Sequence, residues 1–291
     1  MSAKDDTRTN EELLHVALTE EDEDRAWDAI AVLYLRASPD TLEAARQLCA
    51  SADSHARRVG ADILGQLGIS EREKLFQEEA VATLLDMLEG EQDPQALHSI
   101  AVALGHRHDP RAIRPLARLK NHPDFRVREG VVHGIMAYED DLAIATLIEL
   151  SDDPESLVRD WAAFSLGAQI KTDTPDIRAA LLARTTDEDV DIRAEAILGL
   201  AKRYDERAVE ILIPLLRSDI FWDDTTESDY FRTLELEAAE ELADPHLLPA
   251  LEQLRQDWWQ YNEAMEHEDS LYDVLKTVIE VIKAGQPNQE G

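Results

Sequence analysis

The segment D-P-E-S-L-V-R-D-W-A-A-F-S-L-G, at Asp153–Gly167, decides the fold, because it has the pattern of a single amphipathic helix. Asp152 or Asp153 can cap the start of this helix, and Pro154 fits its first turn, where a missing backbone N–H costs nothing. Small or apolar residues recur at helical spacing on one face: Val158, Ala162, Ser165 and Leu166. A face of small residues allows a neighbouring helix to approach closely, and Gly167 is expected to end the helix.

The same pattern returns along the chain. Aligned on Val158, the copies start at residues 24, 56, 96, 127, 158, 192 and 231. Their second position holds an arginine in every copy except one, where it is Leu97: Arg25, Arg57, Arg128, Arg159, Arg193 and Arg232. A regular period of this size indicates a stacked repeat. Amphipathic segments that open with an Asp-containing turn lie between the copies, so each unit is predicted to be two antiparallel helices.

The repeated motif is an Asp-rich turn, then Val-Arg, two variable residues, a small-residue run and Leu-Gly. It resembles the HEAT-like repeats of the phycobilisome-lyase type, over roughly residues 20 to 255. The resemblance implies an all-α, right-handed solenoid of about seven to eight antiparallel helix pairs. In the resembled repeats, the motif arginine bonds to an Asp and to turn carbonyls of an adjacent repeat. We therefore expect the six motif arginines to be structural.

The domain organisation follows from the continuity of the repeat, which favours one long solenoid over two compact domains. We expect disorder in residues 1–9 and 285–291 and a single solenoid over 10–284. Within it we expect regular repeats at about 20–217, an acidic and aromatic loop at 218–230 and capping helices at about 231–284. The first residues lack an apolar signal core and no stretch approaches ~18 apolar residues, so we predict a cytoplasmic protein without membrane contact.

The charge of the chain limits its partners. It has 62 acidic and 29 basic residues, for a net charge of −33, and only seven of the bases are lysines. A nucleic-acid binder needs a basic face, so nucleic acid is excluded as a partner. Three interpretations of the acidity remain open: a solvated surface, an adaptation to a salt-rich habitat, or steering of a basic partner.

No catalytic residue, metal site or cofactor is expected. Cys49 lies on an apolar helix face and is read as a buried, inert thiol. The run H-R-H-D at His106–Asp109 falls at a turn between helices and is read as a polar loop. Deoxyhypusine hydroxylases are HEAT-like enzymes that bind iron through His-Glu pairs on repeat helices, and the corresponding positions here hold other pairs. Bilin lyases share the repeat type, so a lyase-like handler of a chromophore or cofactor is the alternative function.

We therefore hypothesise a non-enzymatic scaffold or adaptor that binds another, basic protein; one form of this is an inhibitor or immunity-like binder. In the resembled fold, the second helix of each unit lines the concave side. The residues expected to face outward there, with acids dominating, are Arg58, Asp62, His98, Glu129, His133, Asp160, Trp161, Phe164, Glu195 and Glu237.

A second candidate patch lies towards the C-terminus, where half of the aromatic residues fall within 221–272. Its members are Phe221, Trp222, Tyr230 and Phe231. Two explanations stay open for these rings. They can close the core of an atypical terminal repeat, or form a binding patch together with the surrounding acids.

Overall fold

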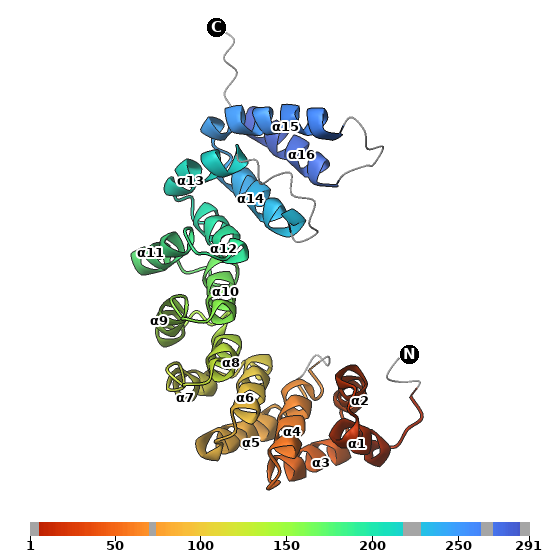
Figure 1. The fold of residues 1–291 in the computed structure, drawn as a ribbon. Helices are drawn as coiled ribbons and strands as arrows, with labels where there is room; N and C mark the ends of the chain where they lie inside the picture. Colours follow the sequence, from red (N-terminus) through yellow and green to blue (C-terminus); the bar gives the residue numbers. More distant parts are fainter. Residues whose placement is uncertain (1–5, 70–73, 218–227, 263–269, 286–291) are drawn as a thin grey trace. The chain divides into compact units, whose positions relative to one another are not determined.

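The computed structural model describes residues 6–69, 74–217, 228–262 and 270–285, and these residues form helices and no strand. They contain eight helix pairs in succession (Figure 1). The first helices are α1 (Asn10–Thr19), α3 (Pro39–Cys49), α5 (Gln77–Gly90), α7 (Ile113–Ala117), α9 (Asp141–Leu150), α11 (Pro175–Arg184), α13 (Arg207–Leu216) and α15 (Leu248–Asn262). The second helices are α2 (Glu23–Arg36), α4 (Ser54–Gln66), α6 (Pro94–Arg107), α8 (Phe125–Ile135), α10 (Ser156–Phe164), α12 (Val190–Ala201), α14 (Ser228–Leu242) and α16 (Ser270–Ala284).

All seven copies of the motif fall in second helices, from α2 to α14, and we call the second helices the motif helices. The predicted all-α solenoid of helix pairs is confirmed. Aspartates start five of the motif helices, because each accepts a hydrogen bond from a backbone N–H that the helix leaves without a partner. These N-caps are Asp22, Asp53, Asp93, Asp124 and Asp189. The aspartate cap predicted for the helix of Val158 is wrong, because α10 has Glu155 at its N-cap, without a side-chain hydrogen bond.

The chain divides into two compact units, Met1–Thr146 and Leu147–Gly291, with the boundary inside α9. In the first unit, α2, α4, α6 and α8 contact one another in succession. In the second unit, α10, α12, α14 and α16 do the same. Each unit thus has a layer of motif helices with the first helices packed beside it. Among the described helices, none has the length and apolar character needed to cross a membrane.

Glycines allow the motif helices to approach closely. A Cβ added to Gly105 of α6 would collide with the carbonyl oxygen of His133 and would lie 3.0 Å from Cα of Gly134, both in α8. A Cβ on Gly167 would lie 3.2 Å from Cα of Gly199 in α12. The prediction that Gly167 ends its helix is wrong, because the chain continues as a π-helical turn over Ser165–Gln169. Gly167 serves close packing.

The predicted limits of order and of the loop need correction. Residues 6–9 were expected to be disordered, yet Thr9 forms a capping box with Glu12 at the start of α1. Asp6 is buried and accepts hydrogen bonds from the Arg8 guanidinium. The predicted loop at 218–230 ends earlier, because α14 begins at Ser228. Residues 1–5, 218–227 and 286–291 lie outside the described part of the chain.

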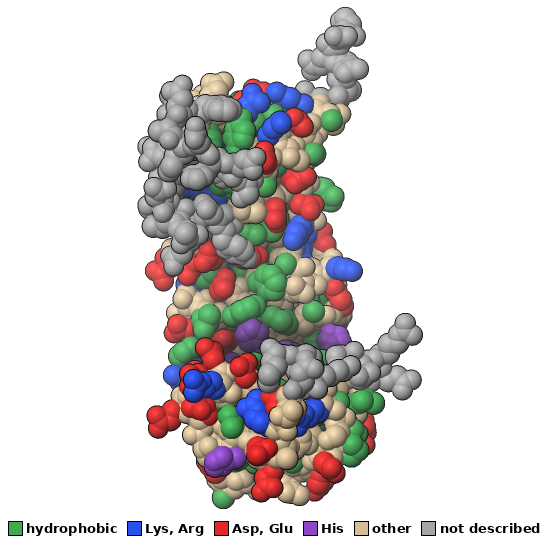
Figure 2. Space-filling view, turned by 90° about the vertical axis from the view of Figure 1, so that its right-hand side faces the viewer, with side chains coloured by type: hydrophobic (Ala, Val, Ile, Leu, Met, Phe, Trp, Pro, Cys, Tyr) green, Lys and Arg blue, Asp and Glu red, His purple; other side chains and the backbone are tan. Residues whose placement is uncertain are grey.

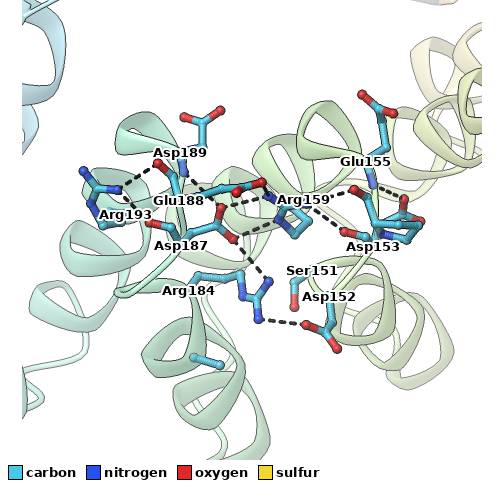
Figure 3. Close-up of polar contacts among 12 residues, drawn as sticks. Ser151, Asp152, Asp153, Glu155, Arg159, Arg184, Asp187, Glu188, Asp189 and Arg193 are labelled. Carbon is cyan, nitrogen blue, oxygen red and sulfur yellow. Dashed lines mark hydrogen bonds and ion pairs between the residues drawn. The ribbon is translucent and has the colours of Figure 1, made fainter.

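Arg159 shows how the motif arginine joins neighbouring repeats (Figure 3). Its Nε and Nη2 each donate to the carboxylate of Asp187, at 2.9 Å, and its Nη1 donates to the carbonyl oxygens of Asp153 and Pro154. The carbonyl oxygen of Asp187 in turn accepts a hydrogen bond from Arg193 at 2.6 Å. The carbonyls thus belong to the arginine's own repeat, and the carboxylate comes from the next one.

Arg57 repeats this arrangement in the first unit. Its Nε and Nη2 donate to Glu91 at 2.6 and 2.8 Å, and its Nη1 donates to two carbonyls of the turn before α4. Arg128 likewise donates to two carbonyls of the turn before α8. Arg232 is buried in α14, where its Nη1 donates to Glu235 at 2.9 Å. The bonds of Arg57 and Arg159 to a carboxylate of the next repeat are charge-assisted and stabilise the stack, whereas Arg232 bonds within its own helix.

Arg25 does not take part in such a link. Its side chain is 72% exposed and lies 3.7 Å from Asp22, the cap of its own helix. The structural role predicted for this copy is therefore wrong. The turn before α2 is only Glu20–Asp22, so the carbonyls six and five positions before Arg25 belong to Thr19, the last residue of α1, and to its C-cap Glu20.

Two further arginines, outside the motif position, are buried in the same way. Arg107, at the end of α6, is fully buried and donates to the carbonyl oxygens of Leu64, Leu67 and Leu75. Arg203, just after α12, donates to the carbonyl oxygens of Leu166 and Ile170 at 2.6 and 2.8 Å. Each guanidinium caps the C-terminal end of the preceding motif helix, where the helix dipole favours a positive charge.

Candidate interaction surfaces

The motif helices α6 and α8 of the first unit bring three of the predicted outward residues together. Glu129 of α8 lies between two imidazoles, with Oε2 3.8 Å from Nε2 of His98 and Oε1 3.6 Å from Nε2 of His133. All three side chains are half-buried. Burial lowers the pKa of His98, and the Glu129 carboxylate opposes that effect. These groups therefore form a polar cluster across α6 and α8.

Asp62 occupies the equivalent face of α4 and is also half-buried. Burial raises the pKa of its carboxyl to about 6, although a hydrogen bond from Ser99 and the charge of Arg58 oppose the rise. Arg58 itself lies 3.3 Å from Nδ1 of His55. Ionisation of Asp62 near neutral pH therefore costs more free energy than ionisation of an exposed aspartate.

The second unit presents an aromatic pair on α10. The rings of Trp161 and Phe164 meet edge to face, with centroids 5.9 Å apart, and both side chains are half-buried. Leu157 lies one turn earlier on the same helix and is 40% exposed. The three residues have the i, i+4, i+7 spacing of one helix face, so they form an apolar stripe at the surface. Figure 2 shows hydrophobic side chains gathered at the height that α10 has in Figure 1.

Asp160 sits inside this stripe, three residues after Leu157 and four before Phe164. Burial raises the pKa of its carboxyl to about 6, and the like charges of Asp191 and Asp189 at the start of α12 add to the rise. The nearby arginines are committed elsewhere: Arg159 binds Asp187 and Arg193 binds turn carbonyls. The aromatic pair is thus bordered by negative charge.

Glu195 departs from the prediction that it faces solvent, because only 5% of it is exposed. The reason is the close approach of the preceding motif helix, which brings Gly167 next to the carbonyl oxygen of Glu195. Glu237 of α14, by contrast, is exposed as predicted. Acids therefore do not dominate these faces as a continuous layer, since half-buried aromatic and histidine residues share them.

The side chains of the second candidate patch lie outside the part of the chain that the structure describes. Phe221 and Trp222 lie outside the described residues, and so do the side chains of Tyr230 and Phe231, whose backbone is part of α14. Further along, Trp258 is buried in the core formed by α12 to α16, 6.2 Å from the ring of Tyr272. This is the packing that a terminal repeat needs to close its core.

Cys49 and the run His106–Asp109, which the sequence analysis considered for chemistry, are part of the helix packing. Cys49 is buried, and burial raises the pKa of its thiol to about 12. The run His106–Asp109 is not simply a loop, because α6 extends through Arg107. His108 then caps the helix with a positive φ of 51° and stacks on Tyr138. In the described part of the chain, no group of three or more His, Cys, Asp or Glu residues is placed to hold a metal ion.

Sequence reasoning missed three residues that the structure makes prominent. Arg107 and Arg203 share a detectable signal, since each precedes by two residues the aspartate that opens the next helix, in R-H-D and R-Y-D. Leu157 immediately precedes the first motif position and was assigned to neither the core nor the surface. Its place in the helical i, i+4, i+7 pattern with Trp161 and Phe164 could have identified it.

Known proteins resemble the chain in sequence and in fold. It is 29% identical to protein YibA of Escherichia coli strain K12 over 228 residues, 76% of each chain. The X-ray structure of E. coli YibA superimposes with a TM-score of 0.71 at 25% identity, covering 95% of this chain and 93% of that one. The complex of CpcE and CpcF of phycocyanin lyase from Nostoc sp. PCC7120 gives a TM-score of 0.47 at 18% identity, over 95% and 96% of the two chains. That value is too low to carry an argument about function.

The model of HEAT repeats matches residues 81–167 and 152–228, which together cover half of the chain. This match, the succession of helix pairs and the arginine links between repeats lead to one conclusion: the chain belongs to the HEAT-repeat family.

Proposed function

We propose that this protein is a non-enzymatic interaction scaffold, that residues 10–284 act as one HEAT-like array, and that its motif-helix faces bind a basic partner protein in the cytoplasm. The observation that carries the proposal is that arginine side chains are held inside the array, whereas the excess of acidic side chains gives a negative surface. Arginines of the motif and of the helix ends are taken up by carbonyls and carboxylates inside the array. The net charge of −33 is therefore expressed mainly as negative surface.

Half-buried side chains on the motif helices support the same proposal. Trp161 and Phe164 supply area that a partner can cover, and aromatic residues often dominate binding energy in interfaces. Glu129 and Glu237 supply negative charge on the two units. Charges at the rim of an interface act mainly on the rate of association, whereas buried contacts act on dissociation.

The test is binding of the partner across ionic strength. The partner is first identified by cross-linking and mass spectrometry in the native host, then purified. Glu237→Lys should slow its association and flatten the salt dependence, since that side chain is exposed. Glu210→Lys, an exposed acid on the first helix α13, is the matched control and should change association little. Equal effects of both reversals would indicate that the charge acts without a defined face, against the proposal.

A further inference from the structure

One face of α10 combines large apolar side chains with a carboxylate and lies outside the buried core of the fold. Leu157, Asp160, Trp161 and Phe164 have the i, i+3, i+4, i+7 spacing of a single helix face. The opposite face of α10 is buried through Val158, Ala162 and Ala163, which pack in the core. The four residues lie on the other face of α10, where Leu157 is 40% exposed and the other three side chains are half-buried, and we call them the α10 stripe.

The α10 stripe has an unusual composition for a solvent-facing helix surface. Three of its four side chains are large and apolar, and the aromatic pair is held edge to face. The fourth, Asp160, places a carboxylate among them, with no hydrogen bond or ion pair to any residue in the described ranges. Its pKa is raised by burial and by Asp191 and Asp189, so the site favours a positive charge from outside.

We infer that the α10 stripe is a docking site for a basic, amphipathic segment of a partner protein, which sets an apolar side chain against Trp161 and Phe164 and a lysine or arginine on Asp160. This rests on the proposed scaffold function and specifies where and how the second unit binds. Charge complementarity selects this occupant. A second copy of the chain would bring a net charge of −33 to a face bordered by Asp160, Asp189 and Asp191.

The test uses a library of random 12-residue peptides displayed on phage, selected on the full chain. We expect the selected peptides to combine arginine or lysine with large apolar residues. Synthetic copies should bind Trp161→Ala at least about tenfold more weakly than the parent, as expected for an aromatic anchor. Asp160→Asn, which keeps the shape of the side chain, should weaken binding at least about threefold through loss of the charge pair.

Leu157→Glu separates an apolar anchor from general acidity. Leu157 is the second residue of α10, and a glutamate in a first turn suits the helix dipole, so the fold should persist. If acidity alone binds basic peptides, Leu157→Glu strengthens binding; if the stripe is the site, it weakens binding about tenfold. The matched control is Leu142→Glu, the second residue of α9, with 39% exposure against 40%. It should leave binding within about twofold of the parent.

The possible outcomes are distinct. Failure to enrich basic amphipathic peptides would overturn the inference. Selected peptides that bind Leu157→Glu and Trp161→Ala as tightly as the parent would also overturn it. If Glu237→Lys still slowed association of the purified partner in that case, the scaffold function would stand without this site. A dimer in sedimentation that Leu157→Glu dissociates would assign the stripe to a second copy and would also overturn the inference.

Discussion

At the scale of single residues, buried arginine links are the features whose loss has the largest predictable cost. Arg159 has 8% of its side chain exposed and Asp187 only 4%, so loss of Arg159 leaves a buried carboxylate with the Arg184 guanidinium, 3.2 Å away, as its remaining cation. Removing one partner of such a pair destabilises far more than removing a surface ion pair. The cost of removing the motif arginine therefore comes mainly from the buried acceptor groups that lose a donor.

We predict that Arg159→Ala lowers the free energy of unfolding by about 1–3 kcal/mol, because two turn carbonyls lose their donor and Asp187 keeps only Arg184 as a cationic partner. Urea denaturation followed by circular dichroism measures the change. Arg25→Ala is the matched control at the same motif position, and its effect should stay within about 0.5 kcal/mol since that side chain is 72% exposed. Equal midpoints for the two variants would contradict the structural role of Arg159.

Asp62 gives a prediction with a definite pH dependence. Its pKa is about 6 in the folded chain against 3.8 for an ordinary aspartate, so the folded state takes up the proton more readily than the unfolded state. Ionisation of Asp62 therefore costs stability above about pH 6, and the cost disappears as the pH falls towards 4. Asp62→Asn should raise the melting temperature at pH 7.5 and leave it nearly unchanged at pH 3.5, below both pKa values.

The control for this pH effect is Asp141→Asn, an exposed aspartate at the start of α9. It should not raise the melting temperature at pH 7.5, because its carboxylate is not buried. A gain from Asp62→Asn that is the same at both pH values would point to the Ser99 hydrogen bond or to packing, not to ionisation.

At the scale of helices, the close approach of α6 and α8 depends on positions without a side chain. Gly105 lies against the backbone at His133, whereas Gly90 at the end of α5 has no atom within 4 Å of where a Cβ would be. Helix propensity favours alanine over glycine by about 1 kcal/mol in a helix interior, and less at a helix end. Only the surroundings distinguish the two glycines.

We predict that Gly105→Ala destabilises the protein by about 1–3 kcal/mol despite the better helix propensity, because the added methyl group forces the two helices apart. Gly90→Ala should be neutral or slightly stabilising, by less than about 1 kcal/mol. Thermal unfolding of both variants decides the matter. A stabilised Gly105→Ala protein would show that α6 and α8 have room to move apart freely.

The helix pairs could be predicted because their signals are local and repeated: the Asp caps, the arginines and the small-residue runs recur with one period. The surface could be predicted only in part. The register that placed Trp161 and Phe164 on the outer face of α10, where both are half-buried, also placed Glu195 in solvent. A helical register carries no information on the neighbouring backbone that Gly167 brings over Glu195. Arg107 was read as part of a polar turn, since its acceptors at Leu64 and Leu67 lie about forty residues away in the sequence.

At the scale of the whole molecule, the net charge of −33 opposes folding through repulsion among surface carboxylates. Added salt screens repulsion between exposed charges and affects buried pairs such as Arg159–Asp187 much less. We predict that the melting temperature rises by several degrees, roughly 3–8 °C, between 0.05 and 0.5 M NaCl at pH 7.5. Scanning calorimetry measures it, and a falling melting temperature would mean that exposed ion pairs outweigh the repulsion.

The shared aspartate of the arginine link also bears on how such a gene can change length. Asp187 accepts Arg159 of the preceding helix pair through its carboxylate and Arg193 of its own pair through its carbonyl group, so the link joins the motif helix of one pair to the turn of the next. Duplication or deletion of one whole pair by recombination joins donor to acceptor again and leaves no buried charge alone. A breakpoint inside a helix pair separates the arginine donor from its carboxylate acceptor. Recombination should therefore change the number of repeats in whole helix pairs.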